Sequence, residues 1–474
     1  MERIQPGTTI DRLTLGEKLA TGGMASLWRA TSPDFTYPLV VKIPFRDPGG
    51  DVSAIVGYEA EEMIHKRLSG PHVPRFAGSG DLGRIPYIAM ELVEGASLAG
   101  EVEKAPLPPE TVARIGLQVA TALAALHRQK VVHLDLKPEN VILAERGAVL
   151  LDFGLAHHAE LPDLLGEESS VPMGSAAYIA PEQVLGERSD PASDIFALGC
   201  ILYQLASGEE PFGRPTTTAG MKRRLYHAPP KLRTIAPKVP RWLESVIERC
   251  MEVDRSRRYA DAEKVLFDLR NPEQVVVERD PPAERTGLLG ALSGLFSRPD
   301  DSKLTGRPTI ERRAAGPSII LSAVDLARGV DPLAEEVLAE TARVLAVRAD
   351  SRLACVSVLK TEIIGSTPGP DGAGRSAYVQ RLVALKDWAR VLRLPDERVS
   401  YHVIEAVSPA DAILNYAKHN GVGHIVIGAR GSSAIRRHLG SVSTEVVAEA
   451  LCSVSVVRIR QIEEDAAQAE GSST

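Results

Sequence analysis

The sequence predicts a multidomain chain, in which an α+β unit is followed by a doubly wound parallel α/β unit. Its 474 residues suit two large domains or about three of ordinary size. Residues 271–316 are rich in proline and charge, which is typical of a connector. From Ser318 onward, apolar strand patterns alternate with helical patterns, as in a parallel sheet. We therefore expect domains at 10–270 and 317–460 and a disordered tail at 461–474.

One short segment inside the connector has an amphipathic pattern. The sequence from Gly287 to Phe296 is GLLGALSGLF, and helical spacing would place its leucines and Phe296 on one face. It is too short to span a bilayer. Docking onto one of the two domains is the favoured role, and contact with a membrane surface or a partner is the alternative.

Composition narrows the class of protein. With 62 acidic and 55 basic residues the net charge is -7, which gives no electrostatic reason to expect nucleic acid as a partner. The chain has no apolar leader core and no run of about 18 apolar residues, so we expect no transmembrane segment and a cytoplasmic location. The four cysteines show no metal spacing and are expected to be free thiols: Cys200, Cys250, Cys355 and Cys452.

Four motifs follow one another in the first half of the chain. Residues 133–140 are HLDLKPEN, residues 151–156 are LDFGLA, APE lies at 180–182, and DIFALG begins at Asp194. In this order they resemble the catalytic and metal-binding loops of bacterial, eukaryotic-like protein kinases. The resemblance implies the bilobal α+β fold of that family.

The same resemblance implies roles for individual residues. Asp135 would accept the proton of a substrate hydroxyl, and Lys137 would steady the transferring phosphate. Asn140 and Asp152 would hold Mg²⁺, with Mn²⁺ as the alternative ion. ATP is therefore the expected cofactor.

The stretch from Leu19 to Trp28, LATGGMASLW, resembles a weak form of the glycine-rich loop over the ATP phosphates. Alanines replace the first and third glycines, whereas Gly22 keeps the middle position and Gly23 follows it. Only the middle glycine must bring its backbone very close to phosphate, so we expect an impaired loop at most. Lys42, in LVVKI, matches the strand lysine that binds the α- and β-phosphates.

A helix is predicted from Tyr58 to Leu68. Counting back from the turn after it selects Glu61 as the ion-pair partner of Lys42, with Glu59 and Glu62 as alternatives. In the strand that follows, Met90 matches the residue that gates the back pocket, and the backbone of 91–93 would meet the adenine edge. The full expected ATP site is Leu19, Gly22, Gly23, Lys42, Met90, Glu91, Val93, Asn140 and Asp152.

One position of the catalytic loop departs from the family pattern. Leu134 stands where arginine is usual, and that arginine commonly pairs with a phosphorylated activation loop. We expect the loop to be ordered in another way. Ser169 and Ser170 are candidate phosphorylation sites, and a flexible acidic loop is the alternative because Glu167 and Glu168 would repel phosphate.

Several residues indicate the substrate class. Lys137, two residues after the expected base, resembles serine/threonine kinases. The segment GSAAYIAPE from Gly174, called here the substrate-side loop, carries Ser175 where a hydroxyl would contact Asp135 and Lys137. Two further residues are expected to be structural: Asp194 would anchor the catalytic loop, and Arg258 would pair with Glu182.

The C-terminal half is predicted to alternate strands and helices: strands at 318–325, 353–359, 399–406, 424–429 and 454–459, and helices at 333–347, 378–392 and 411–419. The stretch 428–443, GARGSSAIRRHLGSVS, resembles the ATP-binding signature of universal stress proteins, although the interval between its glycines is one residue short. The second nucleotide site would comprise Asp325, Gly428, Gly431, Gly440, Ser441 and Ser443. The alternative is a domain that dimerises without nucleotide, and we expect a homodimer through it.

The expected function is an autophosphorylating serine/threonine protein kinase that acts on protein substrates, with a C-terminal nucleotide-binding or dimerising stress-sensor module. An ATP-binding pseudokinase scaffold is the alternative, supported by Leu134 and the two alanines of the glycine-rich loop. It is opposed by the presence of the expected catalytic groups. A stress-response adaptor in which only the C-terminal module matters is a third hypothesis.

Overall fold

A computed structural model describes residues 4–45, 52–169, 171–277, 318–327, 329–361, 376–429 and 440–459. The described residues up to 277 belong to one compact unit and those from 318 onward to a second. The amphipathic segment 287–296 and the predicted tail 461–474 lie outside the described residues. No helix in the described part of the chain combines the length and apolar character that a membrane crossing requires.

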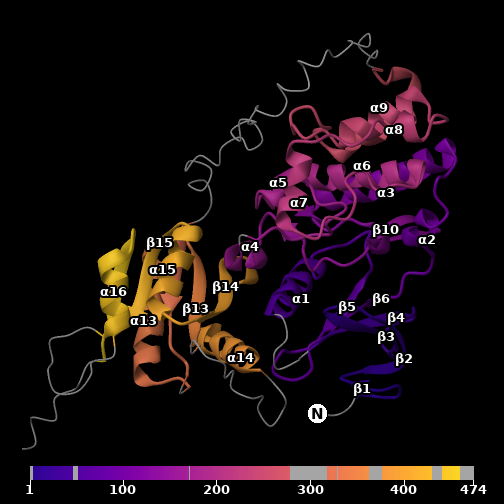
Figure 1. The fold of residues 1–474 in the computed structure, drawn as a ribbon. Coiled ribbons are helices and arrows are strands. Elements are labelled where there is room, and N and C mark those ends of the chain that lie inside the picture. The colour runs from indigo at the N-terminus through magenta and orange to yellow at the C-terminus, as the bar shows by residue number, and fades with distance from the viewer. Residues whose placement is uncertain are drawn as a thin grey trace, which may run out of the picture. The chain divides into compact units, whose positions relative to one another are not determined.

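The N-terminal unit begins with an antiparallel sheet of six strands, in the order β1-β2-β3-β4-β6-β5 (Figure 1). Apolar side chains such as Trp28 and Val41 alternate inward along the strands and form its core. The register pairs Lys42 with Leu27 on one side and Ile88 on the other, which fixes this lysine in the middle of the sheet. The strands are β1 (Thr9–Ile10), β2 (Leu13–Thr21), β3 (Ala25–Thr31), β4 (Leu39–Pro44), β5 (Phe76–Ser79) and β6 (Ile88–Glu91).

Helix α1 spans Val52–His65, so the prediction of a helix over Tyr58–Leu68 had the wrong bounds. The helix contains Gly57, whose missing side chain allows α1 to lie close to the backbone of Gly154: an added Cβ would be 3.3 Å from its carbonyl oxygen. Helix α1 ends at His65, whose buried ring contacts the carbonyl of Pro74 at 2.8 Å. Beyond it, Leu68 belongs to a turn.

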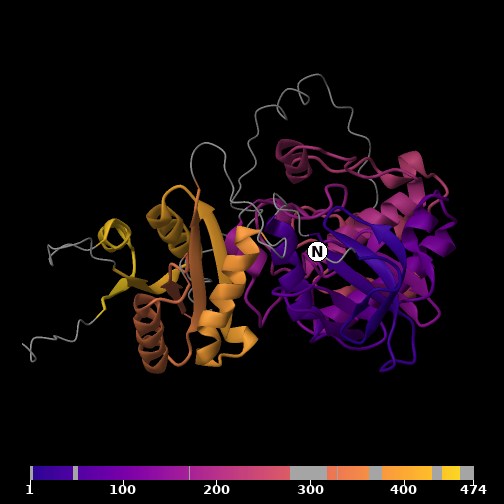
Figure 2. The ribbon, with the colours of Figure 1, turned by 90° about the horizontal axis from the view of Figure 1, so that it is seen from below.

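The second lobe is mainly helical and is built around α3 (Pro109–Arg128) and α6 (Ala192–Ser207), as Figure 1 shows. In Figure 2 the indigo sheet of the first lobe lies in front of these purple-to-magenta helices. Buried residues of α3 recur at helical spacing, for example Ile115, Val119 and Leu123. Helix α6 is buried along nearly its whole length. It ends at Gly208, whose φ of 80° suits a residue without a side chain.

The other elements of this lobe are short strands and helices: β7 (Ala96–Ser97), α2 (Leu98–Val102), β8 (Val131–Val132), η1 (Pro138–Asn140), β9 (Val141–Ala144), β10 (Gly147–Leu150), β11 (His157–His158), α4 (Leu164–Glu168), α5 (Pro181–Val184), α7 (Thr218–Lys222), η2 (Arg223–Leu225), α8 (Leu232–Ile235), α9 (Arg241–Cys250), α10 (Ala262–Arg270) and η3 (Pro272–Gln274). The two buried cysteines of the lobe, Cys200 and Cys250, are free thiols.

The C-terminal unit is a five-stranded, fully parallel sheet in the order β14-β13-β12-β15-β16, which confirms the predicted doubly wound class. Its strands are β12 (Ile319–Ala323), β13 (Arg352–Lys360), β14 (Val399–Ala406), β15 (Val422–Gly428) and β16 (Ser453–Val457). Its helices are α13 (Pro332–Val347), α14 (Ala377–Ala389), α15 (Pro409–His419) and α16 (Ser441–Glu449), and two short turns, η5 (Arg390–Leu392) and η6 (Asp396–Arg398), follow α14.

Each face of this sheet has its own core. Ile320 packs in a cluster with residues of α13 and α14, whereas its neighbour Leu321 packs with residues of α15 and α16. Consecutive residues of a strand point to opposite faces, so β12 serves both cores at once. The predicted helix 378–392 ends as an α-helix at Ala389, and its last residues form the turn η5.

Candidate active site

Asp135 lies at the centre of a set of hydrogen bonds between two loops. Lys137 Nζ donates to Asp135 Oδ2 at 2.7 Å, and Ser175 donates to Oδ1 through both its amide and its hydroxyl, at 2.8 and 2.7 Å. Asn140 Nδ2 donates to the Asp135 carbonyl at 2.9 Å. Residues 135–140 are therefore brought together locally, and Ser175 reaches them from the substrate-side loop.

The loop that carries Asp135 is anchored by Asp194, which lies near the start of α6. The buried Asp194 carboxylate accepts the amides of His133 and Leu134 at 2.8 and 2.9 Å, and contacts His127 Nε2 at 2.9 Å. Burial alone would raise the pKa of Asp194, but these donors hold it below its usual range. Leu134 has a φ of 62°, which is an uncommon conformation for a branched residue. The hydrogen bond from its amide to Asp194 helps to hold this conformation.

Lys42 joins the two lobes electrostatically. Its Nζ lies 2.7 Å from Glu61 Oε2 on α1 and 2.8 Å from Asp152 Oδ1. Burial alone would lower the pKa of Lys42, but the two carboxylates raise it above its usual value, so the amine is charged at neutral pH. Glu61 is the acidic residue of α1 that forms this pair, whereas Glu62 bonds Lys66 and Ser79.

Two side chains fit the requirements of a divalent cation that also binds phosphate. Asn140 donates through its Nδ2, which leaves its Oδ1 as an acceptor, and the Asp152 side chain is 44% exposed. Burial alone would raise the pKa of Asp152, but Lys42 lowers it, so the carboxylate is ionised at neutral pH. Oxygen ligands from one carboxylate and one amide suit Mg²⁺, which takes its remaining ligands from water and phosphate.

The glycine-rich turn between β2 and β3 leaves room beside its backbone. Gly22 donates its amide to the Ala25 carbonyl at 2.9 Å. A Cβ added at Gly22 would make only an ordinary contact of 3.6 Å, and one added at Gly23 would meet no atom within 4 Å. Packing of the described residues therefore does not demand glycine here, and a bound phosphate would supply the reason for it. Leu19 lies just before this turn and is exposed.

The segment between the lobes carries an ion pair that the sequence did not indicate. Met90 is buried at the end of β6, and Glu91 follows it. The Glu91 carboxylate accepts two hydrogen bonds from Arg146, at 2.7 and 3.0 Å, which lower its pKa although burial alone would raise it. The Glu91 side chain thus links the segment between the lobes to the β9–β10 turn. Val93, two residues further, is half-buried.

The segment after Asp152 is ordered by packing. Leu164 and Leu165 of α4 form an apolar cluster with Val56 and Ala60 of α1. Asp163 caps α4 and pairs with Arg188 at 2.9 Å. Packing, a helix cap and an ion pair therefore hold this segment in place.

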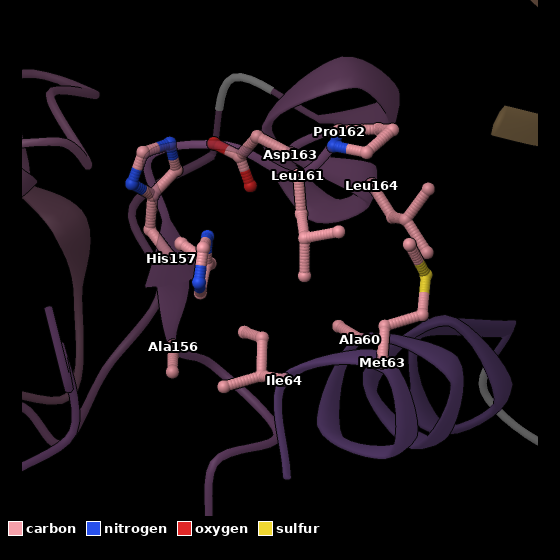
Figure 3. Close-up of a pocket in the computed structure, with 10 residues that line it drawn as sticks. Ala60, Met63, Ile64, Ala156, His157, Leu161, Pro162, Asp163 and Leu164 are labelled. Carbon is pink, nitrogen blue, oxygen red and sulfur yellow. The ribbon is translucent and has the colours of Figure 1, made fainter. Parts of the chain in front are cut away.

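A small cavity of about 10 Å³ lies between α1 and this segment (Figure 3). Figure 3 shows Ile64 and Leu161 on its apolar side and His157 near Asp163 on its polar side. Its volume suits about one water molecule, so it is not a nucleotide site. Burial lowers the pKa of His157, which keeps the ring neutral at physiological pH.

Of the two candidate phosphorylation sites, Ser169 is half-buried directly after α4, and Ser170 lies outside the described residues. Glu167 beside them is buried.

Glu182 and Arg258 form a buried bidentate pair at 2.7 and 3.2 Å, and Ser193 also donates to Glu182. This pair links the substrate-side loop to the base of the second lobe.

In the C-terminal unit, Asp325 and Gly428 lie at the same edge of the sheet, because β12 and β15 are parallel with Ala323 opposite Ile427. Packing already explains Gly428: an added Cβ would lie 2.9 Å from Leu333. Asp325 is half-exposed and lies 3.8 Å from Arg381. Gly431 lies outside the described residues.

The remaining three residues of the expected second site surround the start of α16. Gly440 directly precedes the helix, and Ser441 is exposed at its first position. Ser443 is buried and donates its hydroxyl to the Gly440 carbonyl at 3.0 Å. Ser441 can therefore meet a ligand directly, whereas the Ser443 hydroxyl serves the turn.

The two lobes and the groups between them define the N-terminal unit as a kinase. Residues 13–268 match the protein kinase domain family, and residues 318–458 match the universal stress protein family. The chain belongs to the protein kinase family and carries a universal stress protein domain after its kinase domain. Members of the kinase family use ATP and divalent metal ions.

Similar proteins include bacterial serine/threonine-protein kinases. The serine/threonine-protein kinase PknL of Mycobacterium tuberculosis is 30% identical over 289 residues, 60% of this chain and 72% of PknL. The serine/threonine-protein kinase PknB of Mycobacterium leprae is 30% identical over 320 residues, 65% of this chain and 51% of PknB. The crystal structure of the Mycobacterium tuberculosis PknI kinase domain covers 57% of this chain and 100% of its own, with 23% identity and a TM-score of 0.45.

Proposed function

We propose that this chain is a serine/threonine protein kinase, which transfers the γ-phosphate of Mg-ATP to protein hydroxyls and also phosphorylates itself. The observation that carries the proposal is the Asp135 carboxylate, bonded to Lys137 on one oxygen and to Ser175 on the other. A carboxylate so fixed can accept the proton of an acceptor hydroxyl. As the proton moves to Asp135, the hydroxyl oxygen forms a bond to the γ-phosphorus, and the bond between that phosphorus and ADP breaks.

The other site residues position the nucleotide in this proposal. Lys42, fixed by Glu61, would bind the α- and β-phosphates, and Lys137 would neutralise charge on the transferring group. Asn140 and Asp152 would hold Mg²⁺, or Mn²⁺ in its place. Leu19, Gly22 and Gly23 would cover the phosphates, and Met90, Glu91 and Val93 would line the adenine side.

The complete set of charged groups supports turnover rather than a pseudokinase. A scaffold that only binds ATP has no use for a carboxylate fixed on both oxygens, because Asp135 is not needed to hold the nucleotide. Leucine at position 134, where arginine is usual, removes a possible contact to a phosphorylated loop. The groups around Asp135 remain in place.

The C-terminal domain is proposed to bind a nucleotide at the sheet edge that holds Asp325, Ser441 and Gly440, or to dimerise. Strand β16 supports the second role: it lies at the edge of the sheet, with β15 as its neighbour, and can pair with a second copy. A homodimer formed in this way is the expected assembly.

The test uses the full chain with γ-labelled ATP and Mg²⁺, an added acceptor protein such as casein, and phosphoamino-acid analysis. Phosphoserine or phosphothreonine that disappears in Asp135→Asn supports the proposal. Label in phosphotyrosine would contradict the substrate class. Equal labelling by the wild type and the variant would contradict the enzyme.

A further inference from the structure

Arg224, in η2, is one of the largest fully buried side chains of the described residues, with 1% of its surface exposed. Its guanidinium donates through Nη1 to the Ile179 carbonyl, through Nη2 to the Ala176 carbonyl, and through Nε to the Met221 carbonyl at 3.1 Å. It also lies 5.2 Å from the ring centre of Phe212. Among the described ion pairs, none involves Arg224.

A buried cation without a carboxylate is unfavourable unless its donors are satisfied. Burial accordingly lowers the pKa of Arg224. Three backbone carbonyls and one aromatic face partly offset the lost hydration. The planar fork of arginine lets one side chain bond two carbonyls of the same loop, which the single ammonium of lysine does less well.

The carbonyls of Ala176 and Ile179 belong to the substrate-side loop, one and four residues after Ser175. Ser175 bonds Asp135, Tyr178 donates its hydroxyl to Gln204 at 2.7 Å, and Arg224 holds the positions between and after them. The loop is thus fixed on one side by the proton-accepting carboxylate and on the other by Arg224.

The segment that supplies Arg224 buries few side chains of its own. Helix α7 has no buried residue, and the buried residues of η2 are Arg224 and Leu225. The Arg224 guanidinium therefore links the α7–η2 segment directly to the substrate-side loop. A purely structural link between the loop and the lobe already exists in the Glu182–Arg258 pair.

We propose that Arg224 is a positioning residue for the protein acceptor: it fixes the carbonyls of Ala176 and Ile179, and with them the surface that receives residues flanking the acceptor hydroxyl. The proposal rests on the kinase function proposed above. Arg224 meets neither the nucleotide pocket nor Asp135 directly, so its loss acts on acceptor binding and selectivity and spares ATP binding.

The experiment compares the full-length wild type, Arg224→Met, Arg224→Lys and the control Arg223→Met, which changes the exposed neighbouring arginine. The acceptors are a threonine peptide library randomised at the flanking positions and one peptide selected from it. We measure kcat and KM for the peptide, KM for ATP, and ATP hydrolysis with water as the acceptor.

In Arg224→Met we expect kcat/KM for the peptide to fall about tenfold or more, with a flattened preference at the flanking positions. KM for ATP and ATP hydrolysis should change less than twofold. Arg224→Lys should recover part of the loss, and Arg223→Met should match the wild type. If Arg224→Met does not fold, the same measurements on Arg224→Lys decide, with an intermediate loss expected for the peptide alone.

Unchanged peptide selectivity in a folded Arg224 variant would overturn the proposal, as would an equal fall in peptide transfer and ATP hydrolysis. These outcomes differ from failure of the proposed function, in which the wild type itself would transfer no phosphate to any member of the library.

Discussion

Ser175 gives both its amide and its hydroxyl to a single oxygen of Asp135, at 2.8 and 2.7 Å. That oxygen is therefore occupied from the substrate-side loop, while the other receives Lys137 at 2.7 Å. An acceptor hydroxyl must share or displace one of these donors to reach the carboxylate. The position of the substrate-side loop and the ability of Asp135 to accept a proton are thus linked.

Replacing Asp135 by asparagine should separate chemistry from binding. Asparagine keeps the size of the side chain but is a poor proton acceptor, so phosphoryl transfer should fall by about 10² to 10⁴ with ATP affinity nearly unchanged. Lys42→Met should weaken nucleotide binding as well, because it removes the cation between Glu61 and Asp152. Labelled transfer and equilibrium ATP binding check both variants. Undiminished autophosphorylation in both would show that these residues are not the active site.

Replacing Ser169 and Ser170 together by alanine should change kinase activity by less than tenfold. The reason is that Leu134 cannot pair with a phosphate, and the segment is ordered by α4 and the Asp163–Arg188 pair. Initial rates of transfer to casein give the measurement. A much larger loss would mean that another basic residue binds the phosphorylated loop.

A matched comparison is Leu165→Ala, in the same segment. Leu165 is buried against α1, and removing such a side chain typically costs about 2 to 5 kcal/mol. We expect this variant to lose more activity than the double serine variant. The reverse order would contradict ordering by packing.

The buried Glu182–Arg258 pair should behave as a unit. Removing one partner leaves an uncompensated buried charge, so Glu182→Gln or Arg258→Met should destabilise the kinase domain by about 3 to 5 kcal/mol. The double variant should be less destabilised than the sum of the two. Urea unfolding of the four proteins measures this, and strictly additive changes would argue against direct coupling.

Ionisation of Asp194 should make the free energy of unfolding depend on pH in the acid range. Its pKa in the folded protein lies below the ordinary value of 3.8, so its contribution is present above that pH and is lost as pH falls through the folded value. The free energy of unfolding of Asp194→Asn should therefore be lower than that of the wild type at pH 7, and the gap should narrow below about pH 3.8. Urea unfolding at pH 7, 4 and 3 gives the comparison. A constant gap would show that ionisation of Asp194 does not contribute.

Gly431→Val tests the second nucleotide site, although this residue lies outside the described part of the chain. If the signature binds ATP, a branched side chain should exclude phosphate, and the full chain should bind two nucleotides in the wild type and one in the variant. Equilibrium dialysis and light scattering give stoichiometry and oligomer size. One nucleotide in the wild type would favour a dimerising role for the C-terminal domain.

Part of the site could be predicted because its residues lie close in sequence. Asp135, Lys137 and Asn140 share one short loop, so their mutual contacts follow from local geometry. Glu61 could be selected among its neighbours by counting back from the turn after its helix, and in the structure it is the residue that pairs with Lys42. In the C-terminal unit, alternation of strands and helices was sufficient to predict the sheet.

The features that sequence reasoning missed depend on distant partners. Arg224 follows Lys222 and Arg223, a basic run of the kind usually found in solvent, and only the folded loop shows that it is buried. Arg146 likewise meets Glu91 across 55 positions, and nothing in either neighbourhood indicates the other. The start of α1 was missed because Gly57 argues against a helix unless its packing against Gly154 is known.

The leucine at 134 has a consequence for how a signal could end. A kinase that is ordered by a phosphate can be reset by a phosphatase, which removes the group and releases the loop. Here a hydrocarbon occupies the position where that group would be read, and α4 packs in place without it. We therefore expect removal of a phosphate from Ser169 to leave most of the kinase activity in place.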